Sequence, residues 1–212
     1  MPTWLIVLLP LPVVIYFVLV VIYYLYSRNN MPAPLDAATC YFESIVVLSF
    51  GTTREKKMLA GNEYLARIVC KFCHYARNRH RLAPTRFPMP ILVVQEEVAN
   101  AIKELYNSRS PTVDYTIKSR SQSNAYVGSL EVLLSAIEQY RRLSVDKVLI
   151  IVHPAMYIRI NMLARELGLE NFEVLVISEV YDPESDQVWT RYPILFWALE
   201  PLKYLVDSLR AR

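Results

Sequence analysis

The feature that most constrains this chain is an uncharged apolar segment close to its N-terminus, Trp4–Tyr26. A helix over these 23 residues is about 34 Å long, which is enough to cross a hydrocarbon core of about 30 Å. Trp4 lies at one end of the segment and three tyrosines lie near the other, where aromatic rings favour the membrane interface. The segment therefore predicts a single transmembrane helix.

A cleaved signal peptide is the alternative explanation of this segment, and it fits less well. No basic residue precedes the apolar run, the run is long, and no A-x-A-like cleavage site follows it. Pro10 and Pro12 are expected to kink or disturb the first half of the helix. Because residues 1–27 lack Lys and Arg and Arg28 follows directly, the positive-inside rule favours a cytoplasmic or matrix domain. We expect residues 1–28 to anchor the chain in a bacterial or mitochondrial inner membrane.

The rest of the chain alternates short apolar runs rich in β-branched residues with longer segments of helical period. Residues 29–39 mix Pro, Asn and Ala without an apolar period and are expected to be a linker. In residues 40–190 the alternation predicts an α/β domain, whose mostly parallel five-stranded sheet carries helices on both faces. The expected strands cover 44–50, 90–94, 113–117, 147–152 and 172–178, and the expected helices cover 54–76, 96–106, 124–142 and 156–167.

Composition and charge exclude several classes of protein. Charged residues make up 20% of the 212 residues and apolar residues 54%, which excludes a disordered chain, and three Cys exclude a disulfide scaffold. The net charge is only +3, although residues 54–86 hold nine Lys or Arg residues against two Glu. Their basic part, residues 74–86, has few aromatic residues between its charges, so nucleic acid is not an expected partner. Anionic lipid headgroups, an acidic partner or solvent are the expected surroundings of this part.

Residues 191–212 form an unusually apolar C-terminal tail, whose hydrophobic side chains exceed one face of a helix. Pro193 suits a helix start, and Pro201 is expected to bend the helix. The tail is too short and too interrupted to span a bilayer. We expect it to cover the sheet, rest on the membrane or dock a partner subunit.

Candidate ligand-binding residues follow three of the predicted strands, and open parallel sheets bind ligands at those carboxyl ends. Thr52 lies in the turn after the first strand, and Ser121 lies in a Ser-rich loop after the third. His153 and Arg159 follow the fourth strand, where an Arg side chain can bind a phosphate or carboxylate. The ordinary alternatives are a plain turn, a helix N-cap and a solvated helix face.

Two stretches carry a family resemblance, KVLIIVHPAMYIRINMLARELGL from Lys147 and SRSQSNAYVGSLE from Ser119. They resemble the SanA/YdcF/ElyC-like family over about residues 44–180, with Pro154 and Arg159 on the family's Pro and Arg. The resemblance implies a Rossmann-like sheet, membrane anchoring and a role in the bacterial envelope. It also implies that a nucleotide-like ligand or S-adenosylmethionine would be held by Arg159, Ser121, His153 and Thr52.

The chain departs from the family pattern at the ligand site. Met156 stands where the family has His, and Val152 stands where it has Thr. The acidic residue that the family carries ahead of the Ser-rich loop corresponds to Ile117 or Lys118. Without these basic and acidic groups the site lacks the acid–base chemistry expected of it. We therefore expect a scaffold that has kept its fold and lost its site.

Cys70, Cys73 and His74 form the C-x-x-C-H spacing of covalent haem attachment. Two thiols one helical turn apart can bond haem c while the following His ligates the iron. With His80 the same residues offer a zinc site, although one helix alone cannot surround a tetrahedral ion. The stretch lies inside a predicted helix next to apolar residues, so buried structural thiols are the third explanation.

These observations together predict a non-catalytic, membrane-anchored accessory or scaffold subunit of a larger membrane complex. The first alternative is an enzyme or envelope-biogenesis factor that binds a nucleotide or S-adenosylmethionine. The second alternative is an electron carrier with covalently attached haem. In a scaffold, Arg159 is expected to serve a structural role and pair with a carboxylate, with Glu179 and Asp182 as the candidates.

Overall fold

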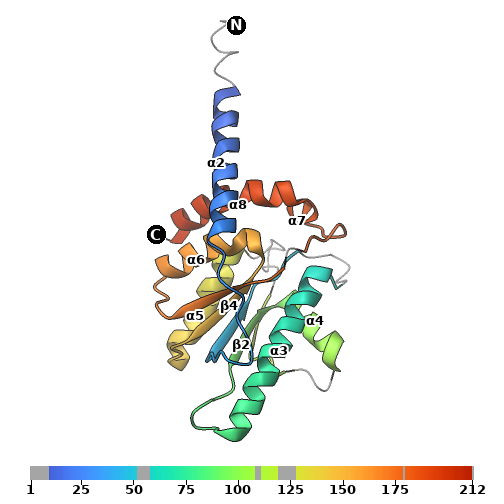
Figure 1. The fold of residues 1–212 in the computed structure, drawn as a ribbon, viewed down its shortest axis with the longest axis vertical. Coiled ribbons are helices and arrows are strands. Elements are labelled where there is room, and N and C mark those ends of the chain that lie inside the picture. Colours follow the sequence, from blue (N-terminus) through green and yellow to red (C-terminus); the bar gives the residue numbers. More distant parts are fainter. Residues whose placement is uncertain (1–9, 52–57, 108–110, 119–127, 179, 212) are drawn as a thin grey trace, which may run out of the picture.

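The computed structural model of the chain describes residues 10–51, 58–107, 111–118, 128–178 and 180–211. In this part of the chain an α/β domain carries a projecting N-terminal helix, α2 (Pro10–Asn29) (Figure 1). The last helix of the chain runs across the base of α2 (Figure 1).

Five parallel strands form the sheet, in the order β3-β2-β1-β4-β5. Every residue of β1 and β4 is buried, which explains why both sequences, apart from Ser44 at the start of β1, are apolar runs instead of alternating patterns. The register places Val46 between Val93 on one side and Ile150 on the other. The predicted five-stranded α/β fold is therefore confirmed. The strands are β1 (Ser44–Val47), β2 (Ile91–Gln95), β3 (Tyr115–Ile117), β4 (Val148–Val152) and β5 (Phe172–Val176).

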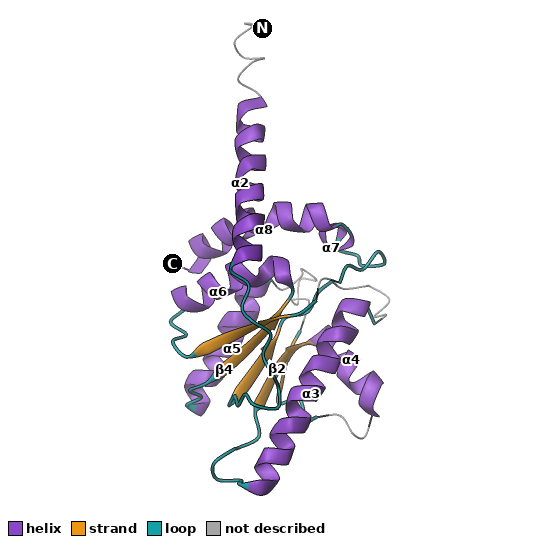
Figure 2. Cartoon of the chain, viewed as in Figure 1, coloured by secondary structure: helices purple, strands orange, loops and turns teal. Residues whose placement is uncertain are grey.

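Helices cover both faces of the sheet (Figure 2). α3 and α4 pack together on one face, and α5 and α6 lie on the other. After α6 and β5 the chain returns over the carboxyl ends of the strands as α7 and α8. The helices are α3 (Ala60–Leu82), α4 (Glu96–Tyr106), α5 (Ser129–Leu143), α6 (Tyr157–Glu166), which follows the short 3₁₀ turn η2 (Pro154–Met156), α7 (Val188–Arg191) and α8 (Pro193–Ala211).

The helix bounds differ most from the predicted ones in α3. The prediction ended this helix at residue 76, but it continues through a basic stretch to Leu82. Arg and Leu are good helix formers, and the first strong stop signal is Pro84, which disfavours helical geometry at the preceding residue. The apolar period therefore ended before the helix did.

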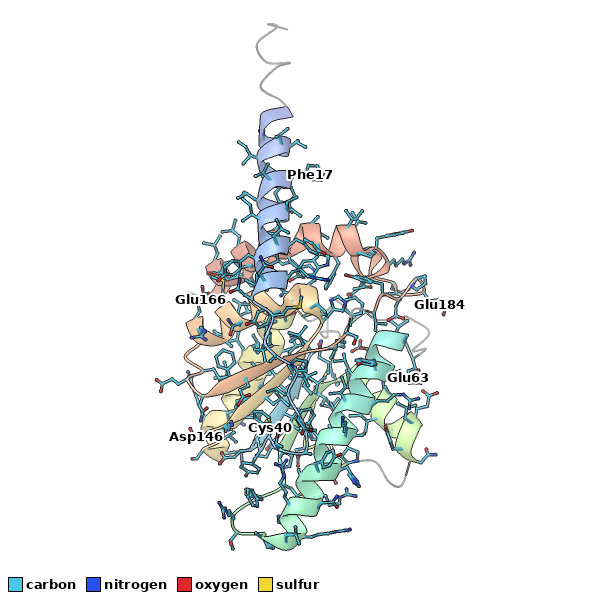
Figure 3. All side chains as sticks on the ribbon, in the orientation of Figure 1. Phe17, Cys40, Glu63, Asp146, Glu166 and Glu184 are labelled. Atoms are coloured by element: carbon cyan, nitrogen blue, oxygen red, sulfur yellow. The ribbon has the colours of Figure 1, made fainter. Side chains whose placement is uncertain are left out.

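α2 is the one helix in the described residues that is long and apolar enough to be a membrane span or a signal sequence. Most of its side chains are exposed, as at Phe17, which projects from the part of α2 beyond α8 (Figure 3). The other end packs against the domain. There the ring of Tyr24 meets Trp197 of α8 edge-on, with 4.9 Å between centroids, and the side chain of Ser27 is fully buried. Residues 1–9, which hold the start of the predicted span, lie outside the described residues.

Candidate functional site

The candidate site is the crevice at the carboxyl ends of β1 and β4. The chain moves from β1 to β2 and β3 on one side of the sheet, and β4 and β5 lie on the other side. The order of strands therefore reverses between β1 and β4, and open α/β sheets bind their ligands at this switch point. Ser49–Gly51 and His153–Met156 leave the two strands here.

An aromatic cluster fills the crevice. The ring of Phe50 stacks on the imidazole of His153, with 4.1 Å between centroids and 10° between planes. Phe196 of α8 meets both rings edge-on, at 5.0 Å from Phe50 and 5.1 Å from His153. Tyr181, which follows β5, closes the other side at 5.1 Å from the imidazole. The space that a ligand ring would use is taken by side chains of the chain itself.

His153 is a packed core residue in this arrangement. Its side chain is 1% exposed, and its Nδ1 accepts a hydrogen bond of 3.3 Å from the amide of Ala155, which caps η2. Burial lowers the pKa of His153 to about 3, and a hydrogen bond with the backbone of Val180 opposes this shift without cancelling it. The imidazole is therefore neutral near pH 7, and aromatic rings pack around it. It offers neither an accessible base nor an open metal ligand.

The N-terminus of α3 is the usual anion-binding position of such a fold, because free backbone amides point outward there. Here the carboxylate of Asp182 occupies it. The amide of Ala60 donates to Oδ1 and the amide of Gly61 donates to Oδ2, both at 2.9 Å. A Cβ on Gly61 would lie 3.1 Å from that carboxylate and 2.9 Å from the Phe50 ring. Glycine at this position thus allows a close approach of the chain's own carboxylate.

Gly51, at the turn after β1, also lies close to side chains from the segment after β5. Its φ of +78° is in the left-handed region that favours glycine. A Cβ there would lie 2.7 Å from Oγ of Ser185 and 3.2 Å from Oγ1 of Thr190. The backbone beside this turn therefore packs against the segment that contains α7.

Arg159 lies in the first turn of α6, as predicted, and is buried in an ion-pair network with α8. Its Nε donates to Oε2 of Glu200 at 2.6 Å, and its Nη2 lies 3.3 Å from Oε1 of the same carboxylate. Its Nη1 donates to Oδ2 of Asp207 at 3.0 Å. Arg159 is 3% exposed and Glu200 is fully buried, so the guanidinium is not available to an external anion.

One of the two predicted partners of Arg159, Asp182, was wrong, because its carboxylate caps α3 as described above. The other, Glu179, lies outside the described residues. Arg159 pairs with Glu200 because α8 folds back over the strand ends and brings Glu200 to α6, a contact between residues 41 positions apart. The structural role expected of the arginine is consistent with this network.

Lys203 adds a second cation to the network. Its Nζ lies 3.3 Å from Oε1 of Glu200 and 4.8 Å from the centroid of the Phe196 ring. Burial lowers the pKa of Lys203, and burial also raises the pKa of Asp207 against the opposing effect of Arg159. Two cations face two carboxylates, so the network is balanced in formal charge.

Little space remains beside this network. The described residues leave a cavity of about 170 Å³ there, lined among others by Gly51, Met156 and Phe196. Pockets that hold drug-sized ligands are typically about 300–1,000 Å³. Thr52 and Ser121, the other predicted ligand residues, lie outside the described residues.

The C-x-x-C-H stretch lies in the middle of α3, away from this site. Cys73 is buried in the core, and His74 is exposed, with Nε2 3.2 Å from Nδ2 of Asn78. Burial raises the pKa of Cys70 to about 11 and that of Cys73 to about 12, so both thiols stay protonated near pH 7. The residues do not fit covalent haem, because the second thiol faces the core. In the described part of the chain no group of three His, Cys, Asp or Glu side chains is placed to hold a metal ion.

Several of the residues that define the site were missed by the sequence analysis. Phe50 and Phe196 were not distinguished from other apolar residues, and Asp182 was predicted as a partner of Arg159 and not as the cap of α3. One signal was present: Glu200, Lys203 and Asp207 are spaced at i, i+3 and i+7 within a mostly apolar helix. This spacing places the three charges on one face, although it does not distinguish a face that meets water from one that meets a buried partner.

The chain shows a Rossmann-like class of fold, with a parallel sheet and a switch-point crevice. No protein-family model, no curated protein and no solved structure matches it.

Proposed function

We propose that this chain is a non-catalytic, membrane-anchored accessory or scaffold subunit of a larger membrane complex. The observation that carries the proposal is the filled crevice. The C-terminal segment, residues 180–211, supplies three of the groups that fill it. Asp182 lies on the amides of α3 that would bind a phosphate, Phe196 packs against the stacked rings of Phe50 and His153, and Glu200 pairs with Arg159. Of the predicted ligand residues, the two that lie in the described part of the chain, His153 and Arg159, thus have partners from the chain itself.

The anchoring part of the proposal is supported by α2. Its exposed apolar surface needs an apolar environment, and its length suits a bilayer. Its C-terminal turns pack on α8 and η2, through Tyr24 on Trp197 and the buried Ser27. A signal sequence that is removed would leave these domain surfaces uncovered, so we propose that α2 is retained.

The likeness to the SanA/YdcF/ElyC-like family belongs to this proposal as well. The Rossmann-like sheet and the positions of Pro154 and Arg159 support it. In this proposal the chain is a member whose arginine has been redirected from a ligand to α8. A subunit that no longer binds a ligand can still present the remaining surfaces of the domain to partners.

Thermal unfolding of the full chain in detergent, with and without candidate ligands, tests the loss of the site. We expect ATP, other nucleotides and S-adenosylmethionine at millimolar concentration to leave the unfolding midpoint unchanged. Ligand that binds only the folded state stabilises it by RT ln(1 + [L]/Kd), so even weak binding would be visible. The proposal would be wrong if one ligand gave saturable stabilisation that Arg159→Ala abolishes and the exposed control Arg67→Ala retains.

A further inference from the structure

α8 is an amphipathic helix whose polar face packs on the domain and whose apolar face is exposed. Its polar side chains face the domain. Glu200 and Asp207 bind Arg159, and the hydroxyl groups of Tyr204 and Ser208 lie 2.7 and 3.2 Å from a carboxylate oxygen of Glu166 on α6. A helix on the surface of a water-soluble domain has the opposite arrangement, with its charged residues outside.

The outward face of α8 is apolar. At about 100° per residue, the exposed apolar side chains fall within an arc of about 120°, and no charged residue lies inside this arc. Ile194 is 78% exposed and Leu209 is 64% exposed, so the face has no cover within the described part of the chain. A contiguous exposed patch of this kind marks a contact with a membrane or another protein. Its members are Ile194, Leu195, Leu202, Leu205, Val206 and Leu209.

The position of α8 indicates which contact this is. Tyr16 and Tyr24 of α2 both reach α8, the first by donating its hydroxyl proton to the carbonyl oxygen of Ala198, the second by its ring contact with Trp197. The two tyrosines are about 12 Å apart along the helix axis, so α8 lies beside the middle turns of α2, from Tyr16 to Tyr24. Figures 1 and 3 show α8 running across α2 at this level, below Phe17. The outward face thus adjoins the apolar surface of α2.

We propose that α8 lies in the plane of the membrane interface, with its outward apolar face inserted among the lipids that surround α2. This inference rests on the proposed anchoring by α2. A bilayer around the apolar segment Trp4–Tyr26 reaches the depth of α8, because Tyr16 and Tyr24, which contact α8, both lie within that segment. Interfacial helices bury an apolar face about 5–10 Å into the boundary between headgroups and acyl chains.

The charged residues near α8 suit this placement. Arg191 precedes the helix and donates to the carbonyl oxygen of Ser185, and Arg210 lies in its last turn and pairs with Glu131 of α5 while its side chain stays 56% exposed. Basic side chains therefore flank the apolar face at both ends, where anionic headgroups would lie. The basic residues 74–86 lie at the far end of α3, on the side of the domain opposite α2 (Figure 1). The inference therefore assigns lipid contact to α8, and it leaves the basic residues 74–86 free for water or a protein partner.

Spin labels on the full chain in vesicles of phosphatidylcholine and phosphatidylglycerol test the inference. Labels are placed at Ile194→Cys and Leu205→Cys on the outward face, at Phe17→Cys on α2 and at Leu82→Cys at the far end of α3, which is 86% exposed. The parent carries Cys40→Ser and Cys70→Ser and keeps Cys73, whose burial disfavours labelling, and it must show no label. Collision with oxygen reports lipid, and collision with a water-soluble nickel chelate reports water.

We expect the labels on α8 to collide more with oxygen than with nickel, as at Phe17, and the label at Leu82 to show the reverse. The inference is overturned if the α8 labels are as open to nickel as Leu82, which places the helix in water. It is also overturned if they are shielded from both reagents, which indicates a contact with a second copy. Nickel access at Phe17 would instead contradict the anchoring by α2, so the two failures are distinguishable.

Discussion

His153 shows how strongly packing alone can change the protonation and the accessibility of an imidazole, a group that is often catalytic. It follows the fourth strand, where a histidine in an open site would act as an acid, a base or a ligand. Phe50, Tyr181 and Phe196 surround its ring instead. The consequence is a neutral imidazole whose pKa is about 3, far below its ordinary 6.5.

This pKa predicts a pH dependence of stability. Between about pH 3 and about pH 6.5 the unfolded chain binds a proton at His153 that the folded chain does not bind. The free energy of unfolding should therefore fall as the pH is lowered from about 6.5, by up to about 1.4 kcal/mol per pH unit from this residue. Above about pH 6.5 the residue contributes no slope. Urea titrations at a series of pH values measure the effect.

The variant His153→Phe keeps an aromatic ring in the stack and removes the titrating group. We expect the difference in slope between the natural chain and this variant to equal the contribution of one proton in this pH range. His74→Gln is the matched control, because the imidazole of His74 is exposed on α3, and its slope should equal that of the natural chain. An unchanged slope in His153→Phe would show that the imidazole is not held neutral.

At the scale of single residues, the sequence predicted where a residue lies in the fold better than it predicted what its side chain contacts. Arg159 and His153 stand where the strand and helix pattern put them, since local apolar period determines where β4 ends and α6 begins. Their partners come from α8 and from the segment after β5, and no local pattern encodes a pairing across 41 residues. Cys73 was open to three explanations because spacing alone does not distinguish a thiol that faces the core from one that faces outward.

At the scale of elements, the C-terminal segment decides what the crevice can do. α8 is docked through its charged face, and the buried pair between Arg159 and Glu200 is the centre of that contact. Removing one partner of a buried ion pair leaves an uncompensated charge, which costs about 3–5 kcal/mol. An exposed pair contributes little, about 0–1 kcal/mol.

We therefore expect Glu200→Gln to lower the free energy of unfolding by about 3 kcal/mol or more, because Arg159 loses its bidentate carboxylate in a dry environment. Chemical denaturation of the full chain in detergent measures this loss. Glu63→Gln is the matched control, since Glu63 pairs with Arg67 in an exposed i,i+4 bridge and should cost less than about 0.5 kcal/mol. Equal losses in the two variants would contradict a buried network between α6 and α8.

The elements themselves were largely predictable. The predicted range 96–106 agrees with α4, and the five predicted strands all occur. The orientation of α8 was not predictable from its composition, because a helix with apolar residues on more than one face does not show which face is covered. Three of its four charged residues, at positions 200, 203 and 207, held that information, and they became interpretable only next to Arg159.

At the scale of the whole molecule, the crevice lies between the sheet and α2. The turn after β4 contacts both α2 and α8, so the carboxyl ends of the strands face the N-terminal helix (Figure 2). A bilayer around α2 would therefore lie over the closed crevice. The opposite end of the domain, with the basic part of α3, faces away from α2, and we propose it as the surface that meets partners.

The central claim is that the chain works as a subunit of a larger membrane complex. The most direct measurement is the protein mass of the particle extracted from native membranes in mild detergent, determined by size exclusion with light scattering and followed by identification of its components. The account predicts a particle well above the 24.6 kDa of one chain, with a second protein in constant ratio across the peak. A protein mass of one chain, or of copies of this chain alone, would contradict it.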